Sequence, residues 1–195
     1  MSSIDAVLTF WFGNAVGDPP SKEVSKRWWT KSAAFDEEIR ASFETLHTAL
    51  MAGEHRQWLE SPRGCAARVI VLDQFSRNMY RDEPRAFASD ALALAATDHV
   101  LERDLLTALG LHEQLFTLMP LMHSESLQRQ EQSIAQFTAL DARAPDSGFA
   151  ANVDFALRHK RIIERFGRYP HRNAILGRTL TAEELEFLKE PGSSF

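Results

Sequence analysis

The sequence predicts an all-α protein made of antiparallel helical hairpins. Three observations lead to this fold class. Apolar residues recur with the 3.6-residue period of a helix, and the two-residue alternation of strands is absent. Residues that cap helices stand at the ends of these segments. The connections between them are short, which favours antiparallel neighbours and therefore hairpins stacked into a curved array.

Seven or eight helices are expected in chain order. They run over about 4–11, 36–52, 65–80, 90–101, 111–119, 125–140, 149–166 and 182–189. Ser124 is placed to begin the sixth, Gly167 to end the seventh, and Thr181 with Glu184 to form a capping box at the eighth. Pro120 is expected to end the fifth, because proline lacks the N–H that a helix interior needs.

Composition indicates a globular protein and excludes several classes. The 195 residues are 44% apolar and 25% charged, which fits a single all-helical domain over residues 1–195. The lone Cys65 forms no internal disulfide, and no targeting segment is visible, so we expect a cytoplasmic protein. No aliphatic run could span a membrane, and a net charge of −5 argues against a nucleic-acid partner.

Known site motifs do not occur in the sequence. It has no glycine-rich phosphate loop, no nucleophile elbow and no zinc-protease helix motif. His123, Glu125 and Glu131 make only a weak metal pattern, so we expect no metal and no cofactor. The oligomeric state is left open.

Basic residues gather in one segment. Residues 158–178 contain seven Arg or Lys and one acid, so they carry +6 and the rest of the chain carries −11. Within this segment, one loop is rich in hydrogen-bond donors, which come from Arg168, His171, Arg172 and Asn173. Its backbone is expected to be fixed by Gly167 and Pro170. Guanidinium groups suit bidentate capture of a carboxylate or phosphate, so this loop is the first candidate for binding.

Polar side chains also lie on the faces of expected helices that should pack into the apolar core. Asp73 and Arg77 are i,i+4 partners on the third expected helix, either as a structural ion pair or as a ligand-facing pair. Glu131 projects from an apolar face, so it should be buried and paired, with Lys160 or an arginine as partner. His159 shares the inner face of its helix and is expected to be a satisfied core histidine.

His123 has no structural explanation in the sequence. It follows a proline-interrupted apolar segment and stands directly before an expected helix start, where free N–H groups attract anions. We therefore treat His123 as a candidate site residue.

Three stretches together resemble a known family. They are Leu72-Asp73-Gln74-Phe75-Ser76-Arg77-Asn78, Pro120-Leu121-Met122-His123-Ser124-Glu125 and Arg165-Phe166-Gly167-Arg168-Tyr169-Pro170-His171-Arg172-Asn173. They closely resemble a bacterial family of unknown function, the domain-of-unknown-function family numbered nine hundred and twenty-four. The resemblance implies a tetratricopeptide-like helical fold, although no clean repeat of about 34 residues appears here. It implies no activity. The family usually has proline where this chain has Ser76, which implies a bend there.

Two functions are compatible with these residues. The first is a binding module for a small anionic ligand or a peptide carboxylate, with a site drawn from eight residues: Asp73, Arg77, His123, Glu131, Arg168, His171, Arg172 and Asn173. The second is a hydrolytic enzyme that uses His123 or His171 as general base with Glu131 or Asp73 as orienting carboxylate. We expect His123, Asp73, Arg77 and the 168–173 loop to converge on one pocket, because buried polar groups must find partners.

Overall fold

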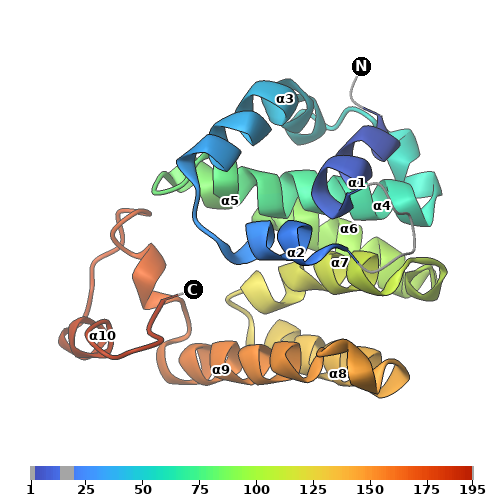
Figure 1. Cartoon of the computed structure of the whole chain (residues 1–195). Helices are drawn as coiled ribbons and strands as arrows, with labels where there is room; N and C mark the ends of the chain where they lie inside the picture. The colour runs from blue at the N-terminus through green and yellow to red at the C-terminus, as the bar shows by residue number, and fades with distance from the viewer. Residues whose placement is uncertain (1–2, 14–19, 195) are drawn as a thin grey trace. The chain divides into compact units, whose positions relative to one another are not determined.

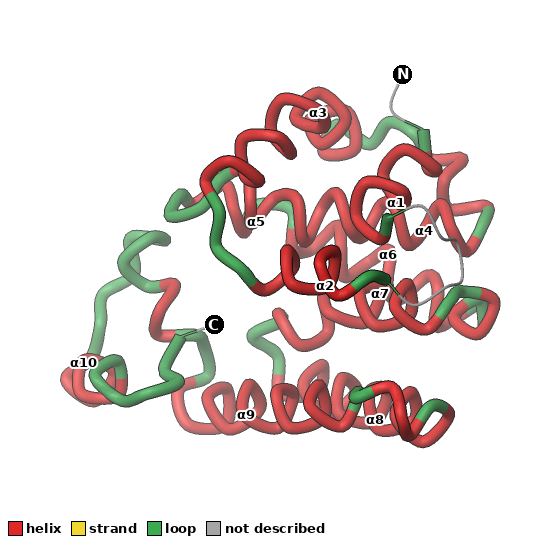
Figure 2. Tube along the Cα trace, viewed as in Figure 1, coloured by secondary structure: helices red, strands yellow, loops and turns green. Residues whose placement is uncertain are grey.

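The computed structural model describes residues 3–13 and 20–194, and helices are the regular structure throughout that part of the chain (Figures 1 and 2). No described residue forms a β-strand, which confirms the all-α fold class. Within the same residues, no helix is both long and apolar enough to cross a membrane. The tetratricopeptide-like stacking and the cytoplasmic location stay predictions.

The chain divides into two units, which we describe separately. Unit 1 comprises Met1–Arg81 and Arg85–Pro120, and unit 2 comprises Asp82–Pro84 and Leu121–Phe195. The prediction of one domain over residues 1–195 concerns how the units combine, and it stays a prediction.

Unit 1 contains the longer part of the helical fold. The helices that lie wholly or mostly in it, with 3-10 and π-helical segments marked η, are α1 (Ile4–Phe12), α2 (Lys22–Trp29), α3 (Ala33–Met51), η1 (Arg56–Glu60), α4 (Pro62–Val69), η2 (Ile70–Phe75), α5 (Ser76–Met79), η3 (Pro84–Phe87), α6 (Asp90–Glu102), η4 (Leu106–Ala108) and α7 (Leu111–His123). Pro84 and the last residues of α7, from Leu121 on, belong to unit 2. The helix α2 has no buried residue, which explains why apolar periodicity did not predict it.

Aromatic side chains form much of the core of unit 1. Trp11 is almost fully buried, and its ring meets those of Phe75 and Phe116 edge-on at centroid distances of 5.6 and 5.3 Å. The Trp28 indole packs on Phe116 at 4.7 Å and donates a hydrogen bond to the Trp11 carbonyl. These contacts attach α1 and α2 to α7 within unit 1. They stabilise it because aromatic rings bury a large apolar area and pack favourably edge-to-face.

The third expected helix is divided by a π-helical segment. The residues Ile70–Phe75 are π-helical and stand between α4 and α5, where the sequence predicted one continuous helix. The Leu72 carbonyl accepts a hydrogen bond from the Ser89 hydroxyl, and the N–H of Ser76 bonds to the Asp73 carbonyl. The departure from α-helical hydrogen bonding therefore lies directly before Ser76, the position where the resemblance implied a bend.

Two expected helix ends are wrong. α7 continues through Pro120 to His123, because the buried side chains of Leu118 and Leu121 on either side of the proline hold it by packing. α8 (Leu127–Arg143) begins with Ser126 at the N-cap, not with Ser124. The carboxylate of Glu125 is bound elsewhere in unit 2, as described below.

Unit 2 is built on one helical hairpin. Its elements after α7 are α8, η5 (Pro145–Ser147), α9 (Ala150–Phe166), η6 (Pro170–Arg172) and α10 (Ala182–Phe187). α8 and α9 lie side by side (Figure 1). Gly167 ends α9 in the left-handed conformation at φ 68°, and the capping box of Thr181 and Glu184 begins α10, so both expected signals are confirmed.

Candidate functional site

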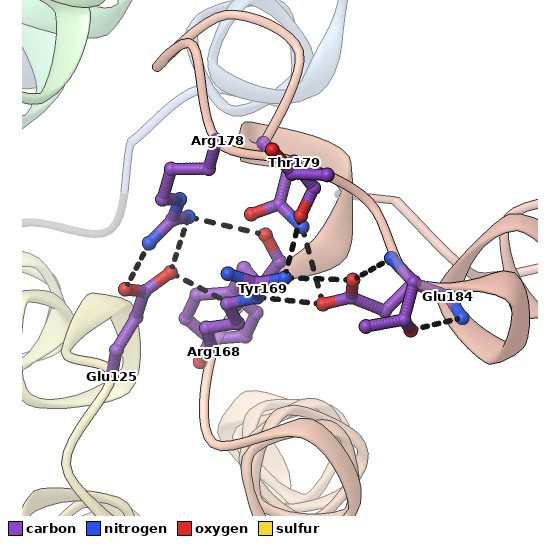
Figure 3. Close-up of polar contacts among 8 residues, drawn as sticks. Glu125, Arg168, Tyr169, Arg178, Thr179 and Glu184 are labelled. Carbon is purple, nitrogen blue, oxygen red and sulfur yellow. Dashed lines mark hydrogen bonds and ion pairs between the residues drawn. The ribbon is translucent and has the colours of Figure 1, made fainter.

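Arg168 is anchored to a buried carboxylate in unit 2. Its Nε and Nη2 atoms donate to the two carboxylate oxygens of Glu184 at 2.6 and 2.8 Å, and Nη2 also donates to the Thr179 carbonyl (Figure 3). Glu184 is 2% exposed and accepts two further hydrogen bonds, from Asn173 Nδ2 and from the backbone N–H of Thr181. The bidentate hydrogen bond from Arg168 lowers the pKa of Glu184 to about 2.

A second ion pair fixes the other side of the same loop. Arg178 donates from both terminal nitrogens to Glu125, with N–O distances of 2.7 and 2.9 Å (Figure 3). Glu125 also accepts the backbone N–H of Tyr169 at 2.8 Å. Burial raises the pKa of Glu125, but the hydrogen bonds from Arg178 and Tyr169 outweigh burial, so the net pKa is lowered. The segment from Arg168 to Arg178 is therefore held at both ends by carboxylates.

Tyr169 is the centre of a polar cluster in unit 2. Its ring is fully buried, and its centroid lies 5.6 Å from the His159 ring, 5.5 Å from the His171 ring and 4.5 Å from the Arg172 guanidinium carbon. Its hydroxyl donates to the Met122 carbonyl at 2.6 Å. We call His123, His159, His171 and Arg172 the histidine–arginine cluster.

The cluster has a positive electrostatic field. Burial is the largest cause that lowers the pKa of His159 to about 3, and the charges of His123, Arg172 and His171 lower it further. Burial also lowers the pKa of His171 to about 4, aided by Arg172. Both imidazoles are therefore neutral at pH 7, and each has a nitrogen lone pair that can accept a proton.

His159 fulfils its expected structural role, since it is 5% exposed and its Nδ1 donates to the Phe155 carbonyl at 2.8 Å. His123 ends α7 and is half-buried, as is His171, whereas Arg172 is 7% exposed. The two half-buried imidazoles are therefore the members of the cluster that solvent reaches.

Asp73 and Arg77 form a separate group in unit 1. Arg77 Nη1 lies 2.9 Å from an Asp73 carboxylate oxygen, and the Asp73 side chain is only 1% exposed. Both terminal nitrogens of Arg77 also donate to Asp90, at 2.9 and 3.1 Å. This confirms the structural ion pair. A role of the pair in ligand binding, and its convergence with the residues of unit 2, stay predictions.

The expected burial of Glu131 is wrong. Its side chain is 59% exposed, although it does pair with Lys160 as predicted, at 3.5 Å. The neighbouring Gln130 is fully buried, and its Nε2 lies within hydrogen-bond distance of the Met122 and Ser124 carbonyls and of the Tyr169 hydroxyl. Adjacent residues of a helix are separated by a rotation of about 100°. An inner face inferred one position too far along the helix therefore assigns to Glu131 the burial that belongs to Gln130.

Within unit 2, the structure therefore places His171 and Arg172 beside the ring of Tyr169, and the charge of His123 acts on His159. The convergence of His123 with the 168–173 loop stays a prediction. The sequence reasoning missed Glu125, Tyr169, Arg178 and Glu184. Glu125 and Glu184 did carry a signal, because each stands near a helix start, but their capping roles already explained them. No group of three or more His, Cys, Asp or Glu among residues 3–13 and 20–194 could hold a metal ion.

These features define an all-helical protein with a polar cluster at the end of a helical hairpin. Residues 7–192 match the family described as bacterial protein of unknown function (DUF924), and the chain belongs to that family. A solved structure of a protein of unknown function from Agrobacterium tumefaciens is similar, with 31% sequence identity and a TM-score of 0.80. The similarity covers 95% of this chain and 96% of that one. Among curated proteins, none matches the chain.

Proposed function

We propose that the protein is a binding module for a small anionic ligand or a peptide carboxylate, held by the histidine–arginine cluster. The basic surroundings of His159 are the observation that carries this proposal, because His123, Arg172 and His171 all oppose protonation of its buried ring. An anion beside these groups would be attracted by the charge of Arg172. Basic groups around a buried ring, with half-buried imidazoles at the edge, are a physical reason for an anion to bind.

The charges of the surrounding network support the proposal. Each of the two carboxylates Glu184 and Glu125 is in a bidentate pair, with Arg168 or with Arg178. Arg172 is 7% exposed and lies over the Tyr169 ring, so it brings a positive charge into the interior of the cluster. In this arrangement Arg168 and Asn173 position the loop through Glu184, while His123, His171 and Arg172 contact the ligand.

The proposal is tested by calorimetric titration with sulfate, inorganic phosphate and a short peptide with a free carboxyl end. We expect Arg172→Gln and His123→Gln to weaken binding of the best of these at least tenfold. Arg161→Gln is the matched control, because Arg161 is an exposed arginine on α9 of the same unit. Circular dichroism checks that each variant is folded. Equal affinity of folded Arg172→Gln, His123→Gln and Arg161→Gln would rule out the cluster as the site.

A hydrolytic enzyme is the second candidate. The neutral state of His171 at pH 7 favours it, because a neutral imidazole can act as a general base. Of the orienting carboxylates first considered, Glu131 is exposed and Asp73 is bound to Arg77, whereas Glu125 is the carboxylate whose charge acts on His171. Release of p-nitrophenol from p-nitrophenyl acetate, compared between the wild type and His171→Gln, tests this alternative.

A further inference from the structure

The serine at the start of α6 is not used to cap that helix. Ser89 occupies the N-cap position and is fully buried, yet its side chain accepts no hydrogen bond from the first turn of α6. A serine at this position usually does accept one. The Ser89 hydroxyl instead donates to the Leu72 carbonyl, in the π-helical segment η2, and lies 3.3 Å from Nε2 of His47 on α3. One hydroxyl therefore connects three helical segments of unit 1.

The direction of these two hydrogen bonds follows from the number of hydrogens available. A carbonyl oxygen only accepts, so the single hydrogen of the Ser89 hydroxyl points to Leu72. The Ser89 oxygen must then accept from His47, and Nε2 of His47 must carry a hydrogen. His47 is 5% exposed, and burial, aided by the charge of Arg85, lowers its pKa, so the ring is neutral at pH 7. A neutral imidazole has one N–H, so Nδ1 of His47 carries no hydrogen.

We infer that His47 is a positioning residue for η2 and that it acts through Ser89. The Nε2–H group of His47 holds the Ser89 hydroxyl in the orientation in which it bonds to the Leu72 carbonyl. Leu72 directly precedes Asp73, so this bond fixes the backbone from which the Asp73 carboxylate meets Arg77. The inference goes beyond the proposed function, because it concerns unit 1 and no residue of the histidine–arginine cluster.

Neighbouring contacts join the same part of unit 1. The hydroxyl of Ser76, at the start of α5, donates to the Arg85 carbonyl, and Arg77 donates to Asp90, the first residue of α6. These bonds run from α5 to the segment that leads into α6. The contact from His47 adds α3 to this group, so α3, η2 and α6 are joined by hydrogen bonds of defined direction.

The tautomer of His47 can be measured in the unmodified protein by nitrogen-15 NMR of the imidazole ring at pH 7. We expect the resonance of a protonated nitrogen for Nε2 and that of an unprotonated nitrogen for Nδ1. The opposite assignment would overturn the inference, because His47 would then have no hydrogen to donate to Ser89. This measurement decides the question even where a substitution prevents folding.

Two substitutions of the same shape test the direction of the bond. The amide nitrogen of glutamine lies as many bonds from the backbone as Nε2 of histidine and donates, whereas an ionised glutamate only accepts. The readout is hydrogen exchange at the Ser76 amide, which bonds to the Asp73 carbonyl at the end of η2. His47→Gln should keep the wild-type rate, and His47→Glu should raise it about tenfold or more, as expected for the loss of a buried hydrogen bond.

Thr45→Gln and Thr45→Glu are the matched controls, because Thr45 is exposed on the same helix. The same difference in charge at this position should leave the exchange rate at Ser76 unchanged. Equal rates in folded His47→Gln and His47→Glu overturn the inference.

Ser89→Ala tests whether His47 acts through the serine. It should raise the exchange rate at Ser76 as His47→Leu does. Adding His47→Leu to Ser89→Ala should then have little further effect, because the hydroxyl that His47 orients is gone. If His47→Leu raises the rate as much in the Ser89→Ala background as in the wild type, His47 acts independently of Ser89 and the inference fails.

Discussion

At the scale of single residues, two neighbours on α8 show how burial separates a structural side chain from a surface one. Gln130 is fully buried, and its amide nitrogen reaches three acceptors from other parts of unit 2. Glu131 is 59% exposed and pairs with the ammonium group of Lys160. The neutral amide is therefore the member of this pair that holds the fold.

The first prediction compares these two positions. Gln130→Ala should destabilise the protein by about 1–3 kcal/mol, because the Ser124 carbonyl and the Tyr169 hydroxyl lose the donor that Gln130 supplies. Glu131→Ala should leave the melting temperature nearly unchanged, because exposed ion pairs contribute little. Thermal denaturation followed by circular dichroism measures both. A larger loss in Glu131→Ala than in Gln130→Ala would contradict this account of α8.

The second prediction concerns the carboxylate that holds Arg168. Glu184→Gln removes the charge that receives two arginine hydrogen bonds and should cost about 1–3 kcal/mol. Glu183→Gln is its neighbour-matched control, since Glu183 is 62% exposed and pairs with Arg165 at the surface. Urea denaturation compares the two. Equal midpoints for both variants would show that the buried pair does not stabilise unit 2.

At the scale of elements, the π-helical segment of unit 1 bears on the bend that the resemblance implies at Ser76. Proline in a helix clashes with the carbonyl four residues earlier, which is Leu72 here. That carbonyl is already bonded to the Ser89 hydroxyl. The backbone before Ser76 is therefore arranged so that a proline would disturb it less than at an ordinary helical position.

The third prediction follows from this geometry. Ser76→Pro should remain folded and lose clearly less stability than Ser42→Pro, which places the same substitution in the regular helix α3 and should cost about 3 kcal/mol or more. Part of the loss at Ser76 comes from its hydroxyl, which donates to the Arg85 carbonyl at 3.2 Å. Denaturant unfolding measures the difference, and a greater loss at position 76 would refute the argument.

At the scale of the whole molecule, buried histidines link stability to pH. The folded pKa values of His159 and His171, about 3 and 4, lie below the ordinary value of 6.5. Between pH 6.5 and these folded pKa values, the unfolded chain therefore binds more protons than the folded protein does. The stabilisation is fully present above pH 6.5 and is lost as the pH falls towards the folded values, by up to about 1.4 kcal/mol per pH unit for each histidine.

The fourth prediction uses the distribution of chromophores. The four tryptophans, Trp11, Trp28, Trp29 and Trp58, all belong to unit 1, whereas the two histidines of lowest pKa belong to unit 2. On acidification from pH 6.5 to 4, we expect far-ultraviolet ellipticity to fall before tryptophan fluorescence changes. His159→Gln should make stability less dependent on pH in this range. Coincident transitions by both probes would contradict the prediction.

Part of the candidate site could be predicted from the sequence. Arg168, His171 and Arg172 were identified because their donors are dense in a turn fixed by glycine and proline. The partners of these residues could not be predicted, since Glu184 follows Arg168 by 16 residues and Arg178 follows Glu125 by 53. Which charged groups meet over such separations depends on packing, and no local period encodes it.

The sequence by itself determined the all-helical class of this protein and most of its longer helices, because their 3.6-residue period and their capping residues act within a few positions of the chain. The left-handed Gly167 and the capping box at Thr181 are local in this sense, and both were expected. Only the tertiary structure decided that α7 passes through Pro120, that Gln130 is buried in place of Glu131, and that Tyr169 gathers histidines and an arginine around its ring. The physical reason is that packing against distant segments sets burial and hydrogen-bond partners, and it can outweigh a local preference of the backbone.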